Sequence, residues 1–233
     1  MSAALNQAAS GAVKSLKRDE IAWRAAQDVP YGGYVNLGIG IPTLVANHVP
    51  AGREMVLHSE NGLLGVGPKP KQGEADPELV NAGKELVTLV PGASIFHHTD
   101  SFAMIRGGHI DIALLGAFQV AANGDLANWK TNDNSLAPAV GGAMDLAAGA
   151  RQVWVLMEHV TREGESRIVE RCSYPLTAPG VVDRIYTNLA VIDVTESGLV
   201  VREIVEGLDF DGLQKQTGAK LTLATDWRMM QRP

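Results

Sequence analysis

The stretch IDIALLG, residues 110–116, is apolar nearly throughout. A strand in a sheet covered on both faces has this composition, whereas a strand with one wet face alternates apolar and polar residues. YVNL at residues 34–37 and VWVLME at residues 153–158 are similar short apolar runs, and helix signals lie between them. Strand and helix signals alternate to about residue 160, which predicts an α/β fold, a three-layer α/β/α sandwich around a mostly parallel sheet.

The other elements expected in this part of the chain follow from periodicity and from the Gly, Pro and Asp residues that begin or end helices. A glycine-rich turn is expected after residue 60, and a surface loop over residues 68–83. The expected helices are 17–27, 43–49, 101–106 with Asp100 as N-cap and Gly107 as stop, and 141–150, and the expected strands are 55–59 and 85–90.

After residue 160 the composition changes. RIVERCSYPL (167–176), RIYTNLAVIDV (184–194) and LVVREIVEG (199–207) are rich in Val and Ile and predict additional strands, with an antiparallel arrangement open. A small helix is expected at residues 209–218. Because the sequence shows no linker, low-complexity tract or repeat, it predicts a single domain over residues 17–233 behind a flexible N-terminal tail, residues 1–16.

Composition excludes several classes of protein. Of the 233 residues 45% are hydrophobic and 20% charged, an ordinary globular balance, and the net charge of −6 with scattered basic residues disfavours nucleic-acid binding. Cys172 is the single cysteine, which fits a reducing compartment and argues against a structural metal site. No apolar run approaches the roughly 18 residues of a membrane span, and the N-terminus lacks a secretory apolar stretch. We therefore expect a cytoplasmic protein, with a short organellar presequence as the alternative.

The stretch LHSENGLLGVGP, residues 57–68, places Glu60 directly after a predicted strand and before Gly62, Gly65 and Gly67. Ligands of α/β sheets bind beyond the carboxyl ends of the strands, and glycines let a ligand approach the main chain. A carboxylate there could be a general base, a nucleophile or a metal ligand, or it could cap a helix N-terminus. No second Asp, Glu or His stands at ligand spacing, so a metal site is disfavoured.

LHSENGLLG resembles the active-site signature of the family I CoA-transferases, which move CoA between 3-oxo acids and succinate. The resemblance covers nearly the whole chain, and it is to the family's β (B) subunit. It implies a sandwich of the CoA-transferase (NagB/RpiA-like) type with extra C-terminal strands. The matching motifs are VNLGIGIPTLVAN (35–47), SENGLLGVGP (59–68), NAGKE (81–85), SFAMIRGGHIDIALLGAFQV (101–120), GDLANW (124–129), GGAMDLA (141–147) and CSYPLT (172–177).

The resemblance implies that Glu60 is the nucleophile of a ping-pong reaction that passes through an acyl-glutamyl anhydride and a glutamyl-CoA thioester. A carboxylate suits this chemistry because an anhydride keeps the acyl group as activated as it was in the thioester, whereas a serine ester would not. Coenzyme A is then a co-substrate, and no permanently bound cofactor is expected.

Four further residues are candidates for the site. Gly141 and Gly142 open a predicted helix and can offer main-chain N–H groups to an oxyanion, and the family has an oxyanion glycine in this motif. Glycines that only permit close helix–strand packing are the alternative. Asn36 and Lys84 match family positions that line the active site, and Lys84 could offset negative charge from carboxylates and CoA.

Other motifs favour structural roles. Thr43 stands where a dinucleotide-binding fingerprint needs its third glycine, so the sequence disfavours a nicotinamide site. Neighbours on an extended chain point to opposite sides, so His97 and His98 favour packing or polar contacts over a metal pair. The sequence suggests no role for His58.

The resemblance also implies a partner. The family's α subunit carries a Gly-Gly-Phe loop that helps to enclose the substrate, whereas Gly-Gly in this chain precedes Tyr34, His109 and Ala143. We therefore expect an α (A) chain of similar size as the partner, in an α2β2 assembly, and no transfer by this chain alone.

Within the family, FHHTDSF (96–102), LLGAFQV (114–120) and APAVGGAMDLA (137–147) are more similar to the branch that uses 3-oxoadipate than to the branch that uses acetoacetate. Succinyl-CoA is the expected CoA donor. The second carboxylate of 3-oxoadipate needs a partner, and Lys130 is one candidate, with the α chain as the other possible source. The rival interpretations are a sugar-phosphate isomerase and a metabolite-binding regulator on the same scaffold.

Overall fold

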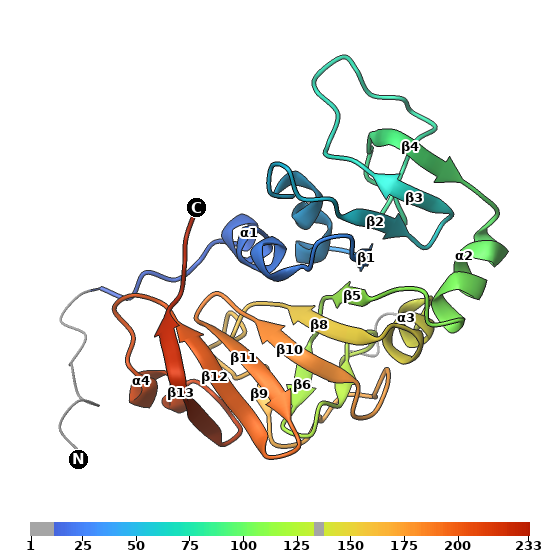
Figure 1. Cartoon of the computed structure of the whole chain (residues 1–233). Helices are drawn as coiled ribbons and strands as arrows, with labels where there is room; N and C mark the ends of the chain where they lie inside the picture. The colour runs from blue at the N-terminus through green and yellow to red at the C-terminus, as the bar shows by residue number, and fades with distance from the viewer. Residues whose placement is uncertain (1–11, 133–137) are drawn as a thin grey trace.

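The computed structural model describes residues 12–132 and 138–233, and a ten-stranded mixed sheet dominates it (Figure 1). The strand order is β13-β12-β11-β10-β8-β5-β1-β2-β3-β4. Neighbouring strands from β10 to β2 pair in parallel, and antiparallel pairs flank this centre. The bounds are β1 (Tyr34–Leu37), β2 (Val56–Ser59), β3 (Leu63–Val66), β4 (Leu89–Ile95), β5 (Ile112–Leu115), β8 (Gln152–Leu156), β10 (Val182–Tyr186), β11 (Ala190–Thr195), β12 (Gly198–Ile204) and β13 (Leu221–Met229).

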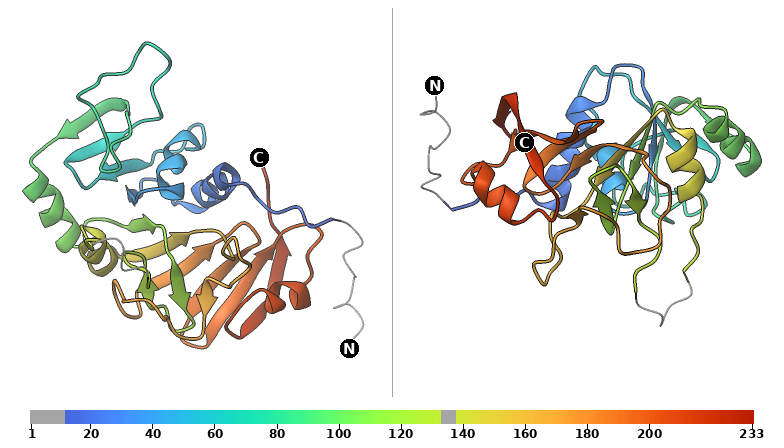
Figure 2. Two further views of the ribbon diagram at one scale, coloured as in Figure 1. Left: turned by 180° about the vertical axis from the view of Figure 1, so that it is seen from behind. Right: turned by 90° about the horizontal axis from the view of Figure 1, so that it is seen from below.

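Helices cover both faces of this sheet (Figure 2). The chain passes from β1 to β2 through the 3-10 helix η1 (Ile41–Asn47), and from β5 to β8 through α3 (Ala143–Gly149). These two connections run in opposite directions along the sheet, so right-handed crossovers place η1 and α3 on opposite faces. Helix α1 (Arg18–Asp28) packs on η1, and α2 (His98–Arg106) packs on α3. The predicted α/β class and its layers are therefore confirmed.

β5 shows why the sequence forms this core. All four of its residues are buried, and its neighbours β1 and β8 lie on either side of it. Apolar side chains on both faces of a strand can be buried only between two helical layers, which IDIALLG predicted.

The C-terminal part adds strands to one edge, as expected. β10, β11 and β12 pair antiparallel in turn, whereas β13 runs parallel to β12, and α4 (Phe210–Lys215) lies between those two strands in sequence. The strand expected over residues 167–176 is reduced to β9 (Ile168–Val169). It belongs to a separate small sheet with β6 (Gln119–Ala121) and β7 (Leu126–Ala127).

A buried ion pair joins the first helix to these strands. Arg24 is 2% exposed, and its Nε and Nη2 donate to the two carboxylate oxygens of Glu203 at 2.8 and 2.7 Å. Its Nη1 donates to Asp28 at 2.8 Å. Bidentate geometry of this kind fixes orientation as well as providing energy.

Residues 1–11 of the expected N-terminal tail lie outside the described residues. The described remainder is attached to the domain: Lys14 N and Leu16 N donate to the main chain of Glu206 and Asn188, and Leu16 is buried. No helix within the described ranges is long and apolar enough to cross a membrane.

Several local predictions were wrong. The helix expected at 43–49 is a 3-10 helix that begins at Ile41. The strand expected at 85–90 instead forms β4 at Leu89–Ile95, since residues 68–88 are held by turns and an isolated bridge between Val80 and Leu86. The N-cap of α2 is His97, whose ring nitrogen accepts from Thr99 N, and Asp100 lies inside the first turn.

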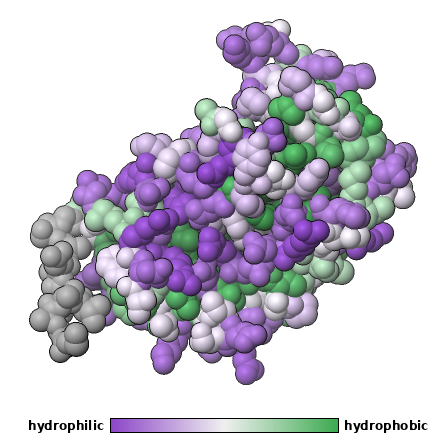
Figure 3. Space-filling model, in the orientation of Figure 1, coloured by the Kyte–Doolittle hydropathy of each residue, from purple (hydrophilic) through white to green (hydrophobic). Residues whose placement is uncertain are grey.

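Hydrophobic residues gather on the surface over β3 and β4 (Figure 3). Val90 is 43% and Ile95 70% exposed on this edge of the sheet.

Candidate active site

Glu60 lies at the tip of a hairpin formed by β2 and β3. Gly62 N donates to Ser59 O at 3.0 Å and has φ +116. A Cβ at Gly62 would collide with the carbonyl oxygen of Phe96, so both the turn and the close approach of that chain require glycine. The predicted glycine-rich turn therefore ends at Gly62. Gly65 instead lies inside β3, where its hydrogen atom faces Ala93.

The carboxylate of Glu60 lines a cavity of about 890 Å³. The segments that follow β1, β5 and β8 also line this cavity, at the carboxyl ends of these parallel strands. The lining from these three segments is Gly38 to Ile41, Gly116 to Phe118, and Met157 with Glu158. The site is therefore where ligands of α/β sheets bind.

Gly142 contacts the Glu60 carboxyl group. A Cβ built on Gly142 would lie 2.5 Å from Oε2 and 2.8 Å from Oε1 of Glu60, so the carboxylate occupies space that any side chain would take. Gly142 is the N-cap of α3, and Gly141 before it has φ +58 and lines the same cavity. The structure thus brings together Glu60, Gly141 and Gly142, which are far apart in sequence.

The electrostatic surroundings of Glu60 oppose its ionisation on balance. Burial raises its pKa, His98 lowers it in part, and the carboxylate of Asp145 raises it further. Asp145 lies in the first turn of α3 and is held by Arg106, which donates from Nε at 2.7 Å and from Nη2 at 3.1 Å. The Arg106 guanidinium keeps the pKa of Asp145 below its usual value, so Asp145 stays ionised beside Glu60.

Asn36 is 1% exposed in β1 and lines neither the Glu60 cavity nor any other described cavity, and its amide bonds to His58. Asn36 Nδ2 is 2.8 Å from His58 Nδ1 and 3.4 Å from His58 O. Because the amide nitrogen faces both atoms, we assign Nδ1 as the acceptor, and the proton lies on Nε2, which is 2.8 Å from Ser101 Oγ. Burial lowers the pKa of His58 to about 4, so the ring is neutral.

Asn36 Oδ1 is buried and has no hydrogen-bond partner among the described residues.

Sequence reasoning missed the contribution of His58, although one signal was available. Alternation along β2 puts His58 and Glu60 on the same side, and parallel pairing places His58 opposite Asn36.

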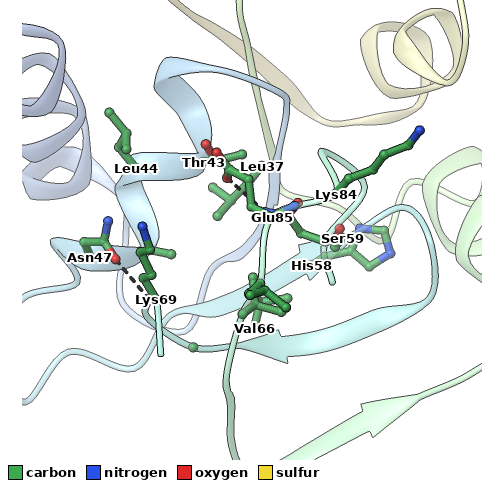
Figure 4. A pocket seen from close by; sticks show the side chains of 15 residues that line it. Leu37, Thr43, Leu44, Asn47, His58, Ser59, Val66, Lys69, Lys84 and Glu85 are labelled. Atoms are coloured by element: carbon green, nitrogen blue, oxygen red, sulfur yellow. Dashed lines mark hydrogen bonds between the residues drawn. The ribbon is translucent and has the colours of Figure 1, made fainter. Parts of the chain in front are cut away.

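Lys84 lies elsewhere. It has φ +63 and lines a second cavity of about 350 Å³ together with Ser59, Lys69 and Asn81 (Figure 4). Its side chain points away from Lys69 in this view. Glu60 does not line this second cavity, whereas Ala82, two residues before Lys84, lines the first. The structure therefore does not bring Lys84 into the cavity of Glu60.

Metal-ion and thiol chemistry find no support in the described ranges. They hold no group of three or more His, Cys, Asp or Glu residues that could bind a metal ion. Burial raises the pKa of the Cys172 thiol to about 11, which leaves it protonated.

Comparisons with known proteins show which family the chain belongs to. The model of the coenzyme A transferase family matches residues 18–216. The chain belongs to this family. As a CoA-transferase it is 60% identical over 210 residues to the B subunit of 3-oxoadipate CoA-transferase from Acinetobacter baylyi, a match that covers 90% of this chain and 97% of the relative. It is 51% identical over 203 residues to the B subunit of succinyl-CoA:3-ketoacid coenzyme A transferase from Helicobacter pylori, with 87% and 97% covered.

A solved structure shows the same fold. The apoenzyme of an acyl-CoA transferase from Escherichia coli O157:H7 matches 93% of this CoA-transferase chain with a TM-score of 0.73 at 20% identity. The match spans 43% of the E. coli chain, which is therefore more than twice as long as the matched part. The family resemblance and the fold class predicted from the sequence are both confirmed.

Proposed function

We propose that this chain is the β (B) subunit of a CoA-transferase that moves CoA from succinyl-CoA to a 3-oxo acid, with 3-oxoadipate favoured and acetoacetate as the alternative. The relative named for 3-oxoadipate is 60% identical, and the relative named for 3-ketoacids is 51% identical. The single observation that carries the proposal is the half-buried Glu60 carboxylate packed against Gly142 in a large cavity.

Glu60 performs the transfer in four steps. A carboxylate oxygen attacks the thioester carbon of succinyl-CoA, and the CoA thiolate leaves, so that a succinyl-glutamyl anhydride forms. The thiolate attacks the glutamyl carbonyl carbon, and succinate leaves. The carboxylate of the 3-oxo acid then attacks the glutamyl-CoA thioester and releases the thiolate. Attack of this thiolate on the 3-oxoacyl carbon of the new anhydride gives 3-oxoacyl-CoA and restores Glu60.

The surroundings suit these steps. Burial removes water from the Glu60 carboxylate and raises its pKa, which makes the ionised group a stronger nucleophile and protects the anhydride from hydrolysis. Main-chain N–H groups at Gly141 and Gly142 are the candidate donors to the tetrahedral oxyanions. Asn36, held by His58, stays a candidate site residue on the family resemblance, although it is buried and lines neither cavity.

A partner chain, the α (A) chain, completes the site in our proposal, in an α2β2 assembly with CoA as co-substrate and no permanently bound cofactor. The relatives are named as B subunits, and the E. coli chain is more than twice as long as the part this chain matches. Apolar side chains in the cavity lining are also exposed: Ile39 at 70% and Phe118 at 38%. Such residues fit a surface that a second protein chain covers. We also retain the cytoplasmic location as part of the proposal.

The test is to incubate the αβ complex with succinyl-CoA and to search for a CoA adduct on Glu60 by peptide mass spectrometry. We expect the adduct in the wild type and its absence in Glu60→Gln, because an amide cannot form the anhydride. A sugar-phosphate isomerase or a binding protein would form no adduct. Turnover by Glu60→Gln at a tenth of the wild-type rate would remove Glu60 as the nucleophile.

A further inference from the structure

The cavity that contains Glu60 is also lined by arginine side chains. Arg18 extends from the start of α1, and Arg162 and Arg167 extend from the segment between β8 and β9. None of these arginines forms an ion pair with a carboxylate of the described residues, although Glu158 lines the same cavity and the exposed Glu163 interacts electrostatically with Arg162 and Arg167. The cavity therefore offers positive charge that the described part of the chain does not neutralise by direct pairing.

Arg167 is the best positioned of these arginines because its main chain is bonded on both sides. Its N–H donates to His159 O at 3.1 Å, its carbonyl accepts from Val120 N at 2.9 Å, and a bridge between Val160 and Ser166 closes the hairpin before it. Arg18 and Arg162 are exposed, so solvent screens their charges, whereas Arg167 is half-buried.

The guanidinium of Arg167 is incompletely bonded. Its Nη1 donates to Ala117 O at 3.4 Å, a long bond, and its Nε is buried without a partner among the described residues. Buried side-chain polar atoms in folded proteins are bonded in the large majority of cases, and an unmet N–H of a charged group is costly. In the described ranges only one other buried side-chain polar atom lacks a partner, the Oδ1 of Asn36 in β1.

We propose that Arg167 binds the distal carboxylate of a dicarboxylic acyl group while its other end reacts at Glu60. This inference rests on the proposed function and deepens it. In a ping-pong reaction both acyl groups occupy the same cavity in turn, and succinyl and 3-oxoadipyl groups both carry a second carboxylate. A guanidinium binds a carboxylate through two parallel N–H···O hydrogen bonds. It therefore stabilises the bound dicarboxylic group and makes no such bonds with the methyl end of acetoacetate.

Lys130 was the cation that the sequence suggested for this carboxylate. It lines neither of the two cavities, and residues 133–137 of the loop that follows lie outside the described residues. Arg167 therefore replaces Lys130 as the candidate cation on this chain. It lies 37 positions after Lys130 in the sequence, and the segment after β8 places it at the cavity.

The experiment compares two CoA donors in the αβ complex. Succinyl-CoA carries the distal carboxylate and acetoacetyl-CoA does not, and either donor loads CoA onto Glu60 in the first half of the reaction. We expect Arg167→Met to lower kcat/KM for succinyl-CoA about ten- to hundredfold, the range for a charge-assisted hydrogen bond, mainly through KM. Loading from acetoacetyl-CoA stays unchanged, which also shows that the variant is folded and assembled.

Two further variants sharpen the result. Arg167→Lys keeps the charge without the forked geometry and restores part of the loss for succinyl-CoA. Arg171→Met removes an exposed arginine that does not line the cavity and leaves both donors unaffected. Equal losses for both donors, or no loss for succinyl-CoA in Arg167→Met, would overturn this inference alone. A wild-type complex that loads no CoA from either donor would overturn the proposed function and this inference together.

Discussion

At the scale of single residues, the proposed nucleophile, Glu60, must be ionised in surroundings that favour its neutral form. Asp145 is one cause, since its carboxylate raises the pKa of Glu60. Asp145→Asn removes this charge, so the pKa of Glu60 falls. Because only the ionised form attacks, the acidic limb of the kcat/KM profile for succinyl-CoA shifts to lower pH. Asp111→Asn is the matched control, since Asp111 pairs with Arg151 at 3.0 Å and not with the site. An acidic limb that shifts to higher pH, or that does not shift, contradicts this account.

The same residue predicts a conflict between activity and stability. The folded state raises the pKa of Glu60 above its unfolded value, so the ionised carboxylate destabilises the fold at pH values above the folded pKa. Glu60→Gln removes this cost, and we expect a Tm equal to or above that of the wild type at pH 8. The difference shrinks as the pH falls through the raised pKa. Glu170→Gln, at an exposed glutamate, is the control for a general charge effect. A variant with a lower Tm at pH 8 would refute the prediction.

At the scale of elements, the start of α3 fits against the tip of the β2–β3 hairpin. Gly142 has φ −76 and ψ −5, which alanine also adopts, but its Cβ would overlap the Glu60 carboxyl group. Gly142→Ala should therefore leave stability nearly unchanged and lower kcat/KM about a hundredfold, the cost of displacing a reacting group by about 1 Å.

Gly141→Ala is the matched variant with the opposite expectation. Gly141 has φ +58, where a Cβ costs roughly 1–2 kcal/mol, but an added Cβ would meet no atom within 4 Å. This variant loses stability in urea unfolding and retains more activity than Gly142→Ala. The reverse pattern would show that the Gly142 contact with Glu60 does not matter for transfer.

At the scale of the whole molecule, exposed apolar side chains such as Ile39 and Phe118 line the cavity of Glu60. We expect no transfer by the isolated chain until the α chain is added. Ile39→Asp should weaken assembly, seen as a higher concentration of the α chain for half-maximal activity, with the Tm of the isolated β chain unchanged because Ile39 is 70% exposed. Tyr31→Asp, at a residue 67% exposed that does not line the cavity, should assemble normally. Full transfer by the single chain would contradict the proposal of two chains.

The sequence by itself determined the elements whose signals are local. β1 was predicted with its observed bounds, and α1 and β5 within two residues, because apolar runs, helical periodicity and Pro30 act through neighbours in the chain. The position of Glu60 after a strand and, within two residues, the start of α3 were also readable from the sequence. The order of motifs was enough to identify the family.

Only the tertiary structure decided which of these residues meet. Glu60 contacts Gly142, Asn36 bonds to His58, and Arg167 reaches the cavity of Glu60, while Lys84 lines a different cavity. β4 lies further along the chain than predicted, since pairing with β3 sets its bounds. Strand pairing and helix crossovers bring together segments that are tens of residues apart in the sequence. The pattern of residues along one segment does not specify which distant side chains this pairing places in contact.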